Sequence, residues 1–161
     1  MAGQFLGAQL PHRATYAAWW SLAIGGVIMC LAGCMFFLFG HQFAYFFTGD
    51  WNDPTTTQVG ELLKIIACVT PFLALVMILT GALRGAGDTT WPLLFTAFGF
   101  FVIRIPLAAY LSFETIPFFE NLSGLGWGVS GAWYAMSIDV AIRSLMVLGR
   151  FSHGGWKNVK V

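Results

Sequence analysis

Three charged side chains lie inside long apolar stretches of the sequence, where they could carry chemistry or join helices. Asp139 falls near the middle of one apolar stretch, and Arg143 follows it four residues later. Residues spaced i and i+4 share one face of a helix, so these two side chains can pair. Arg104 lies in the preceding apolar stretch, and its long side chain can also reach Asp139. An acidic group in the middle of a membrane helix costs roughly 2.5–3.5 kcal/mol, so it normally faces the protein interior and a partner.

Two roles for Asp139 follow from this arrangement. A carboxylate in a membrane helix can respond to protons or other cations, which would make it a coupling site. Alternatively, the carboxylate and its arginines form a structural pair that holds the last two apolar segments together. Two arginines beside one carboxylate favour its ionised form, whereas a proton carrier must change its protonation state. We therefore favour the structural role and keep ion coupling as the alternative.

A polar turn separates the second and third apolar segments. Arg84 and Asp88 flank a glycine-rich triplet, residues 85–87, whose glycines allow backbone conformations closed to other residues. Asp88 or Thr90 can cap the next helix, with Pro92 in its first turn. The turn lacks the spacing and the lysine of a phosphate-binding loop. We expect a structural turn that can also act in gating.

Two prolines fall inside apolar segments. Pro71 and Pro106 each lack an amide donor, and each ring meets the carbonyl four residues earlier, at Ala67 and Val102. A neighbouring helix, a polar side chain or water can satisfy the freed carbonyl. The sequence leaves two interpretations open for both prolines, a hinge and a static kink.

The composition identifies the chain as an integral membrane protein. Hydrophobic residues make up 58% of its 161 residues and charged residues only 9%, against about 25% charged in soluble domains. Scattered basic residues and a net charge of +1 give no sign of a nucleic-acid partner. The sequence also lacks the Ser/His/Asp sets, paired carboxylates and metal-spaced His or Cys groups of enzymes. We therefore expect neither an enzyme nor a metal site.

Four segments are long and apolar enough to cross a bilayer. A hydrocarbon core about 30 Å thick needs about 20 apolar residues in a helix. We therefore predict an all-α integral membrane protein with four transmembrane helices, the first of which can extend toward Phe47. The approximate bounds are 17–39, 62–83, 91–111 and 129–148, separated by turns at 41–60, 84–90 and 112–128 and followed by the tail 149–161.

The distribution of charge predicts how the segments are oriented. Basic residues favour the cytoplasmic side of a membrane. With four spans, one side carries Arg13, Arg84, Arg150, Lys157 and Lys160, and the other carries Asp50, Asp53, Glu61, Glu114 and Glu120 with Lys64. We therefore expect a multi-pass protein of the plasma membrane with both termini and the tail in the cytoplasm. Trp91 and Trp156 are expected at the inner interface, as is typical of tryptophan.

Several ordered motifs resemble those of the multidrug and toxic compound extrusion (MATE) transporters. The most specific is the turn that runs from Thr80 to Pro92, and the sequence Arg104-Ile105-Pro106-Leu107 follows it. The stretch that begins Thr70-Pro71-Phe72 is similar to the tenth helix of the family. Residues 126–135, followed by Met136, Asp139 and Arg143, resemble the twelfth.

This resemblance implies a fold and an activity. Family members have twelve helices in two six-helix lobes, with a substrate cavity between the lobes, and export organic compounds in exchange for protons or sodium ions. Residues 1–161 would then be part of the second lobe, from the ninth to the twelfth helix, and a C-terminal fragment that does not transport alone. The partners implied are the remaining helices, organic small molecules and the lipid bilayer, with no cofactor besides the coupling ion. In the family, the tenth helix is one of the helices that can carry an ion-binding carboxylate. The corresponding segment 62–83 contains none, so the sequence leaves open whether the coupling ion is a proton or sodium.

Three alternatives differ in mechanism. A lipid or polysaccharide flippase of the same superfamily would share the fold and differ in substrate. A small exporter that works as a dimer needs a membrane-embedded glutamate in its first helix, and the segment 17–39 contains no acidic residue. A non-transporting membrane subunit would instead dock on other helices through faces of small residues such as Gly25 and Gly33.

Overall fold

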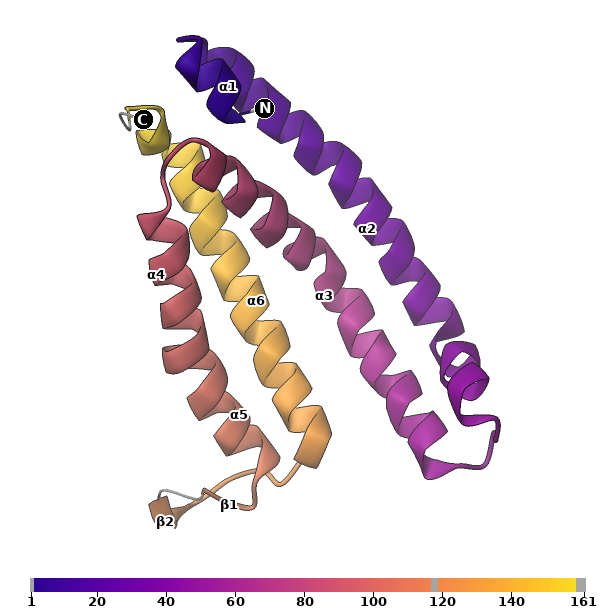
Figure 1. Cartoon of the computed structure of the whole chain (residues 1–161). Coiled ribbons are helices and arrows are strands. Elements are labelled where there is room, and N and C mark those ends of the chain that lie inside the picture. Colours follow the sequence, from indigo (N-terminus) through magenta and orange to yellow (C-terminus); the bar gives the residue numbers. More distant parts are fainter. Residues whose placement is uncertain (1, 117–118, 159–161) are drawn as a thin grey trace.

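The computed structural model describes residues 2–116 and 119–158, and within these ranges the chain is mostly helical (Figure 1). A short helix, α1, is followed by two long helices, and a broken span and a final long helix complete the bundle. A small hairpin lies in the connection before the final helix. The elements are α1 (Ala2–Gly7), α2 (Pro11–Thr48), α3 (Pro54–Gly85), α4 (Thr90–Phe98), the π-helix η1 (Gly99–Arg104), α5 (Ile105–Ser112), β1 (Thr115–Ile116), β2 (Phe119–Ser123), α6 (Gly128–His153) and the 3-10 helix η2 (Gly155–Asn158).

Four helical segments of the described chain are long and apolar enough to cross a membrane, which confirms the predicted fold class. They are α2, α3, the continuous run Thr90–Ser112 formed by α4, η1 and α5, and α6. Many large apolar side chains on these helices are exposed, among them Leu31, Phe46 and Phe101. Such side chains suit contact with lipid or with further helices and would be unfavourable in water.

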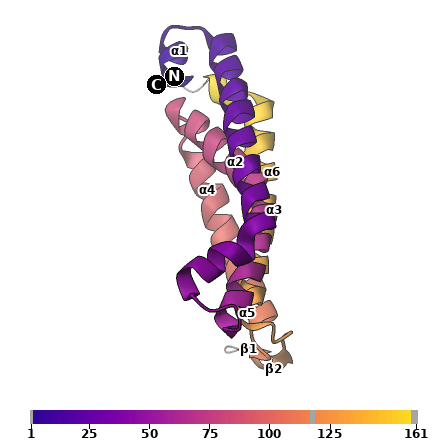
Figure 2. The same ribbon diagram turned by 90° about the vertical axis from the view of Figure 1, so that its right-hand side faces the viewer.

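Successive spans along the chain run in opposite directions (Figure 1). In space they lie side by side in the order α2, α3, α6 and α4–α5. Turned by 90°, the bundle is narrow, so the helices form a thin layer (Figure 2). The short helix α1, the turn between α3 and α4, and η2 lie at one end of the bundle (Figure 1). The turn between α2 and α3 and the hairpin β1–β2 lie at the other end.

The turn predicted over residues 41–60 is much shorter in the structure, where the first span does extend past Phe47 and the second begins well before residue 60. Helix α2 ends at Thr48, where Gly49 adopts a left-handed conformation with φ 74°. Helix α3 begins at Pro54, and the carboxylate of Asp53 caps it by accepting the amide hydrogen of Thr55 at 2.8 Å. This hydrogen bond lowers the pKa of the Asp53 carboxyl because it stabilises the charged form.

Helix α2 is also kinked, which the sequence analysis did not anticipate. Phe39 has φ −114° and ψ 15°, outside the helical range. The next residue, Gly40, is buried where a Cβ would come within 3.3 Å of the carbonyl oxygen of Gly60. The kink therefore coincides with a close approach of the α2 and α3 backbones.

The hairpin β1–β2 is held against the ends of the last two spans by backbone hydrogen bonds. Leu125 and Trp127 donate their amides to the carbonyls of Tyr110 and Leu111, each at 2.9 Å. At the start of α6, a Cβ on Gly131 would meet the carbonyl of Leu111 at 2.6 Å. The residues just before α6 thus fix its start against the end of α5.

The buried core is concentrated at the end of the bundle that carries α1 and η2. Small and branched side chains of α2, α3 and α6 meet there, and two aromatic residues close the cluster. Trp156 is completely buried, stacks on Phe151 with ring centroids 5.0 Å apart, and donates its indole hydrogen to the Phe151 carbonyl at 2.9 Å. Trp156 therefore packs inside the protein and does not face the surroundings, and its level at the inner membrane interface stays a prediction. Its apolar ring is buried in protein and its one donor is satisfied, as a buried indole requires.

Candidate functional site

The centre of the candidate site is Asp139, whose side chain is fully buried in the middle of α6. Its Oδ2 atom accepts a hydrogen bond from Arg143 on the next turn of the same helix. Arg104 of the neighbouring span places its Nη2 atom 2.9 Å from the same oxygen. The structure thus brings together the three residues that the sequence singled out, as a cluster that links two spans.

A π-helix positions Arg104 for this contact. In η1 the turn is wider than in an α-helix, and the amide of Ile105 donates to the carbonyl of Phe100, five residues earlier. The wide turn comes directly before Pro106, whose ring disfavours a regular α-helical turn because it meets the carbonyl four residues earlier. Pro106 itself lies in the first turn of α5, where the missing amide is tolerated.

Gly99, the first residue of η1, allows the side chain of Asp139 to lie close to the η1 backbone. A Cβ on this buried glycine would collide with the Oδ1 atom of Asp139 and lie 3.4 Å from Nε of Arg143. Glycine has no Cβ and lets backbone and side chain approach closely. The sequence analysis did not single out Gly99, because the need for a glycine arises only from the packing of η1 on α6.

The cluster contains two guanidinium groups and one carboxylate, so it carries one positive charge in excess. Arg143 is mostly buried and Arg104 is partly exposed, and the Arg104 guanidinium also lies 5.7 Å from the centre of the Phe100 ring. Among the described residues, Oδ1 of Asp139 and the Nε atoms of both arginines find no hydrogen-bond partner. A carboxylate in this setting is strongly bound to its partners, and such a pair is well suited to hold helices in register.

A second charged pair lies at the end of the bundle that carries α1 and η2. Arg150, near the end of α6, donates from Nε at 2.9 Å and from Nη2 at 2.8 Å to Oδ2 of Asp88. Asp88 is buried, although it lies in the turn between α3 and α4. The Arg150 guanidinium also lies 5.1 Å from the centre of the Trp91 ring, at the start of α4. One arginine therefore ties together the turn, α4 and α6.

This pair corrects the sequence analysis of the polar turn. Neither Asp88 nor Thr90 caps the third span: α4 begins at Thr90, and its N-cap, Thr89, makes no side-chain capping bond. Asp88 is engaged by Arg150 instead. Arg84, the other residue that flanks the turn, is exposed and takes no part in the pair. The partners Asp88 and Arg150 are 62 residues apart, and no local pattern connects them.

A third charged group lies on α3 near the other end of the bundle. The Oε1 atom of Glu61 is 2.8 Å from Nζ of Lys64 and 3.5 Å from Nε2 of His41. Glu61 and Lys64 border a cavity of about 500 Å³ between α2, α3 and α6, which Tyr134 and Ser137 also line. Helix α3 begins at Pro54, earlier than the predicted segment 62–83, and therefore includes the carboxylate of Glu61.

Pro71 lies inside α3 without interrupting it. The carbonyl that it frees, on Ala67, faces α2 where Gly33 leaves room: a Cβ on Gly33 would lie 3.0 Å from that oxygen. The neighbouring Thr70 donates its hydroxyl to the carbonyl of Ile66 at 2.8 Å. The hinge role of Pro71 and Pro106 stays a prediction.

Metal binding finds no support in the described ranges, since no group of three or more His, Cys, Asp or Glu side chains gathers there. The arrangement as a whole is that of a multi-pass helical membrane protein with ion pairs between its spans. The chain belongs to the MatE family of membrane transporters, whose profile matches residues 1–110.

Curated relatives are named as multidrug resistance proteins. The chain is 31% identical to the "Probable multidrug resistance protein NorM" of Thermotoga maritima, over 86% of this chain and 27% of that protein. It is 28% identical to the protein of the same name in Rhodopseudomonas palustris, over 92% of this chain and 30% of the relative. The "Multidrug resistance protein NorM" of Burkholderia vietnamiensis is also 28% identical, over 92% of this chain and 31% of its own length. The chain therefore spans less than a third of the relatives it matches.

Proposed function

We propose that residues 1–161 form the C-terminal part of a secondary active efflux antiporter that exports organic compounds in exchange for protons or sodium ions. The observation that carries this proposal is the similarity to multidrug resistance proteins over 86–92% of the chain. A family profile over residues 1–110 supports the same function. A lipid or polysaccharide flippase of the same superfamily is the alternative, and a substrate assay separates the two.

Within a twelve-helix transporter we assign the four spans to helices nine to twelve. The ninth helix would be α2 and the tenth α3, which ends in the turn before Asp88. The broken span α4–η1–α5 would be the eleventh and α6 the twelfth. The order of the motifs along the chain supports this assignment, and the alternating directions of the four spans are compatible with it (Figure 1).

The charged pairs suggest which parts of the lobe move together. Transporters of this kind alternate access largely by rocking one group of helices against another. The eleventh and twelfth helices are joined near their middle by the cluster of Arg104, Asp139 and Arg143. They are joined again at one end by the pair of Asp88 and Arg150. We infer that α4–α6 move as one rigid unit, with Asp139 in a structural role. Pro71 in α3 is then the candidate hinge next to this unit.

We further propose that the end with α1 and η2 faces the cytoplasm and that the protein lies in the plasma membrane. The ends of α2, α3 and α6 that lie there (Figure 1), together with η2, contain Arg13, Arg84, Arg150 and Lys157, in keeping with the excess of basic residues in cytoplasmic loops. Lys160, also counted in the prediction, lies outside the described residues. In intact cells, an impermeant thiol reagent should label the variant Asp50→Cys and spare Lys157→Cys. The reverse labelling would contradict this orientation.

Everted vesicles test the proposed activity. Vesicles that contain the complete transporter should move a fluorescent organic cation when a proton or sodium gradient is imposed. Vesicles that contain only residues 1–161, in equal amount by immunoblot, should not. Gradient-driven transport by residues 1–161 alone would overturn the proposal that they are one part of a larger antiporter.

A further inference from the structure

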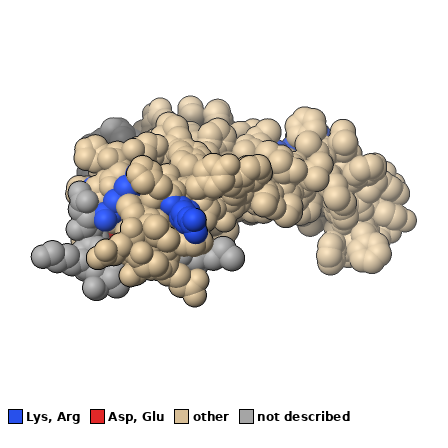
Figure 3. All heavy atoms as spheres, turned by 90° about the horizontal axis from the view of Figure 1, so that it is seen from above, with Lys and Arg blue, Asp and Glu red and all other residues tan. Residues whose placement is uncertain are grey.

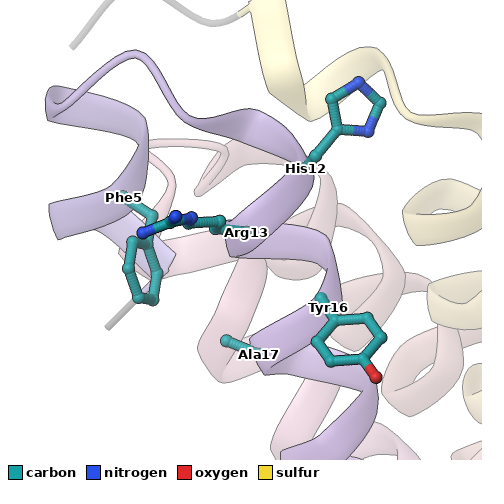
Figure 4. Close-up of a pocket in the computed structure, with 5 residues that line it drawn as sticks. All are labelled: Phe5, His12, Arg13, Tyr16 and Ala17. Carbon is teal, nitrogen blue, oxygen red and sulfur yellow. The ribbon is translucent and has the colours of Figure 1, made fainter.

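A cavity of about 530 Å³ opens where α1 meets the start of α2. Its lining combines the apolar ring of Phe5 with the polar side chains of His12 and Arg13 and with Tyr16, one turn further along (Figure 4). Phe5 comes from α1, and the Arg13 side chain points back toward it (Figure 4). Helix α1 is seated against the end of α3, where a Cβ on Gly3 would collide with the carbonyl of Gly85.

A second hollow continues the first one along α2. It is lined by Tyr16, Trp19, Trp20 and Ala23 and shares Tyr16 with the first cavity. Residues 13, 16, 20 and 23 recur every three or four positions, so they lie on one face of the helix. The two hollows follow one another along this face of α2, which we call the groove, with a cation beside the first hollow and aromatic and small side chains along the second.

The mouth of this groove lies at the end of the protein that carries a few basic side chains on a mostly uncharged surface (Figure 3). Seen from that end, the surface shows lysine and arginine and no acidic side chain (Figure 3). Asp88 is the acid of that end, and Arg150 already neutralises it. Arg13 is exposed and makes no ion pair with any described residue. A ligand at the mouth should therefore be an anion.

The length of the groove matches one leaflet of a bilayer. Ten residues separate Arg13 from Ala23, and a rise of 1.5 Å per residue gives about 15 Å. This is half of the roughly 30 Å hydrocarbon core. Tyrosine and tryptophan favour the level of the headgroups, and basic pockets beside membrane helices bind anionic headgroups. A soluble anion would use the mouth of the groove alone, whereas a lipid uses its whole length.

We propose that the groove of α2 from Arg13 to Ala23 binds an anionic phospholipid. The phosphate pairs with Arg13, the headgroup lies beside His12, and one acyl chain packs along Tyr16 and Trp20 toward Ala23. The lipid would thereby join α1 to the first span at the face that α3 does not cover. This site does not depend on the identity of the transported substrate.

Native mass spectrometry of the complete transporter, released from nanodiscs that contain phosphatidylglycerol and phosphatidylcholine in equal amounts, tests the site. Arg13→Gln should lower retained phosphatidylglycerol about fivefold at the site, the effect expected for one arginine near an anionic surface. Arg13→Lys keeps the charge and should retain the lipid. Arg84→Gln, which removes an exposed arginine at the same end, should leave retention unchanged. Equal retention by Arg13→Gln and Arg84→Gln would overturn the proposal.

A photoreactive acyl chain separates lipid from other occupants. Phosphatidylglycerol with a diazirine in its acyl chain should label the segment from Tyr16 to Ala23 in the wild type, and Arg13→Gln should reduce that labelling about fivefold. Competition by inorganic phosphate at millimolar concentration would identify a site for free anions and contradict the proposal. Labelling elsewhere with none on this segment would show that protein covers the groove, which also contradicts it.

Discussion

Replacing Asp139 with asparagine removes one charge from the buried cluster and hardly changes its shape. The carboxylate is fully buried and is the shared partner of Arg104 and Arg143. Without it, two guanidinium groups remain in the protein interior with no opposite charge. Removing one partner of a buried ion pair typically costs about 3–5 kcal/mol. A chain of 150–250 residues would lose about 2–4 °C per kcal/mol, and the shift per kcal/mol is smaller in a longer chain, so the unfolding midpoint of the complete transporter should fall by at most roughly 20 °C.

The assay is thermal unfolding of the detergent-solubilised transporter, followed by the loss of its monodisperse peak in size-exclusion chromatography. Asp50→Asn is the matched control, because Asp50 lies in the exposed turn between α2 and α3, and its midpoint should stay near that of the wild type. The triple variant Arg104→Met, Asp139→Leu and Arg143→Met removes every charge of the cluster. It should recover the wild-type midpoint, since apolar replacement of a whole buried ion pair is often neutral.

One result would refute the structural role of Asp139. If Asp139→Asn accumulates in the membrane and unfolds as the wild type does, the carboxylate does not hold the helices together. If transport by that variant also loses its dependence on pH or sodium, Asp139 takes part in coupling. The alternative that the sequence left open would then be correct.

Further substitutions test other contacts. Gly99→Ala should destabilise the protein by about 1–3 kcal/mol in the same unfolding assay, because the new methyl group meets Asp139; an unchanged midpoint would contradict this packing. Arg150→Met should cost about 1–3 kcal/mol by leaving the buried Asp88 unpartnered, and Asp88→Asn/Arg150→Met should recover part of it. Since the pKa of Asp53 is lowered, its cap should contribute fully above the ordinary value of 3.8 and be lost as the pH falls through the lowered pKa. Relative to their intrinsic exchange rates, amides at the start of α3 should lose protection over that range, and Asp53→Asn should abolish that dependence.

Hydropathy was sufficient to predict four spans, because each needs about 20 apolar residues regardless of its neighbours. It failed at the boundary between the first two spans, where His41 and Glu61 lie on helices and Glu61 contacts both His41 and Lys64. Each charged or polar side chain in isolation favours a position outside the hydrocarbon core. Their mutual contacts, which bring α2 and α3 together, depend on tertiary structure.

At the candidate site, the sequence could predict contacts between residues a few positions apart, but not contacts between distant residues. The i,i+4 pair of Asp139 and Arg143 follows from helical geometry, and the structure contains it. The π-helix that presents Arg104 changes the register of the span by an amount that no periodicity in the sequence encodes. The pair of Asp88 and Arg150 joins residues 62 positions apart, so it arises only when α6 packs beside the turn.

Transport by the purified complete protein in proteoliposomes tests the central claim most directly. With a fluorescent organic cation inside and a proton or sodium gradient across the membrane, we expect efflux that stops when an ionophore collapses the gradient. Efflux that is independent of both gradients, or none with protein shown to be folded and correctly inserted, would contradict the assignment as an antiporter.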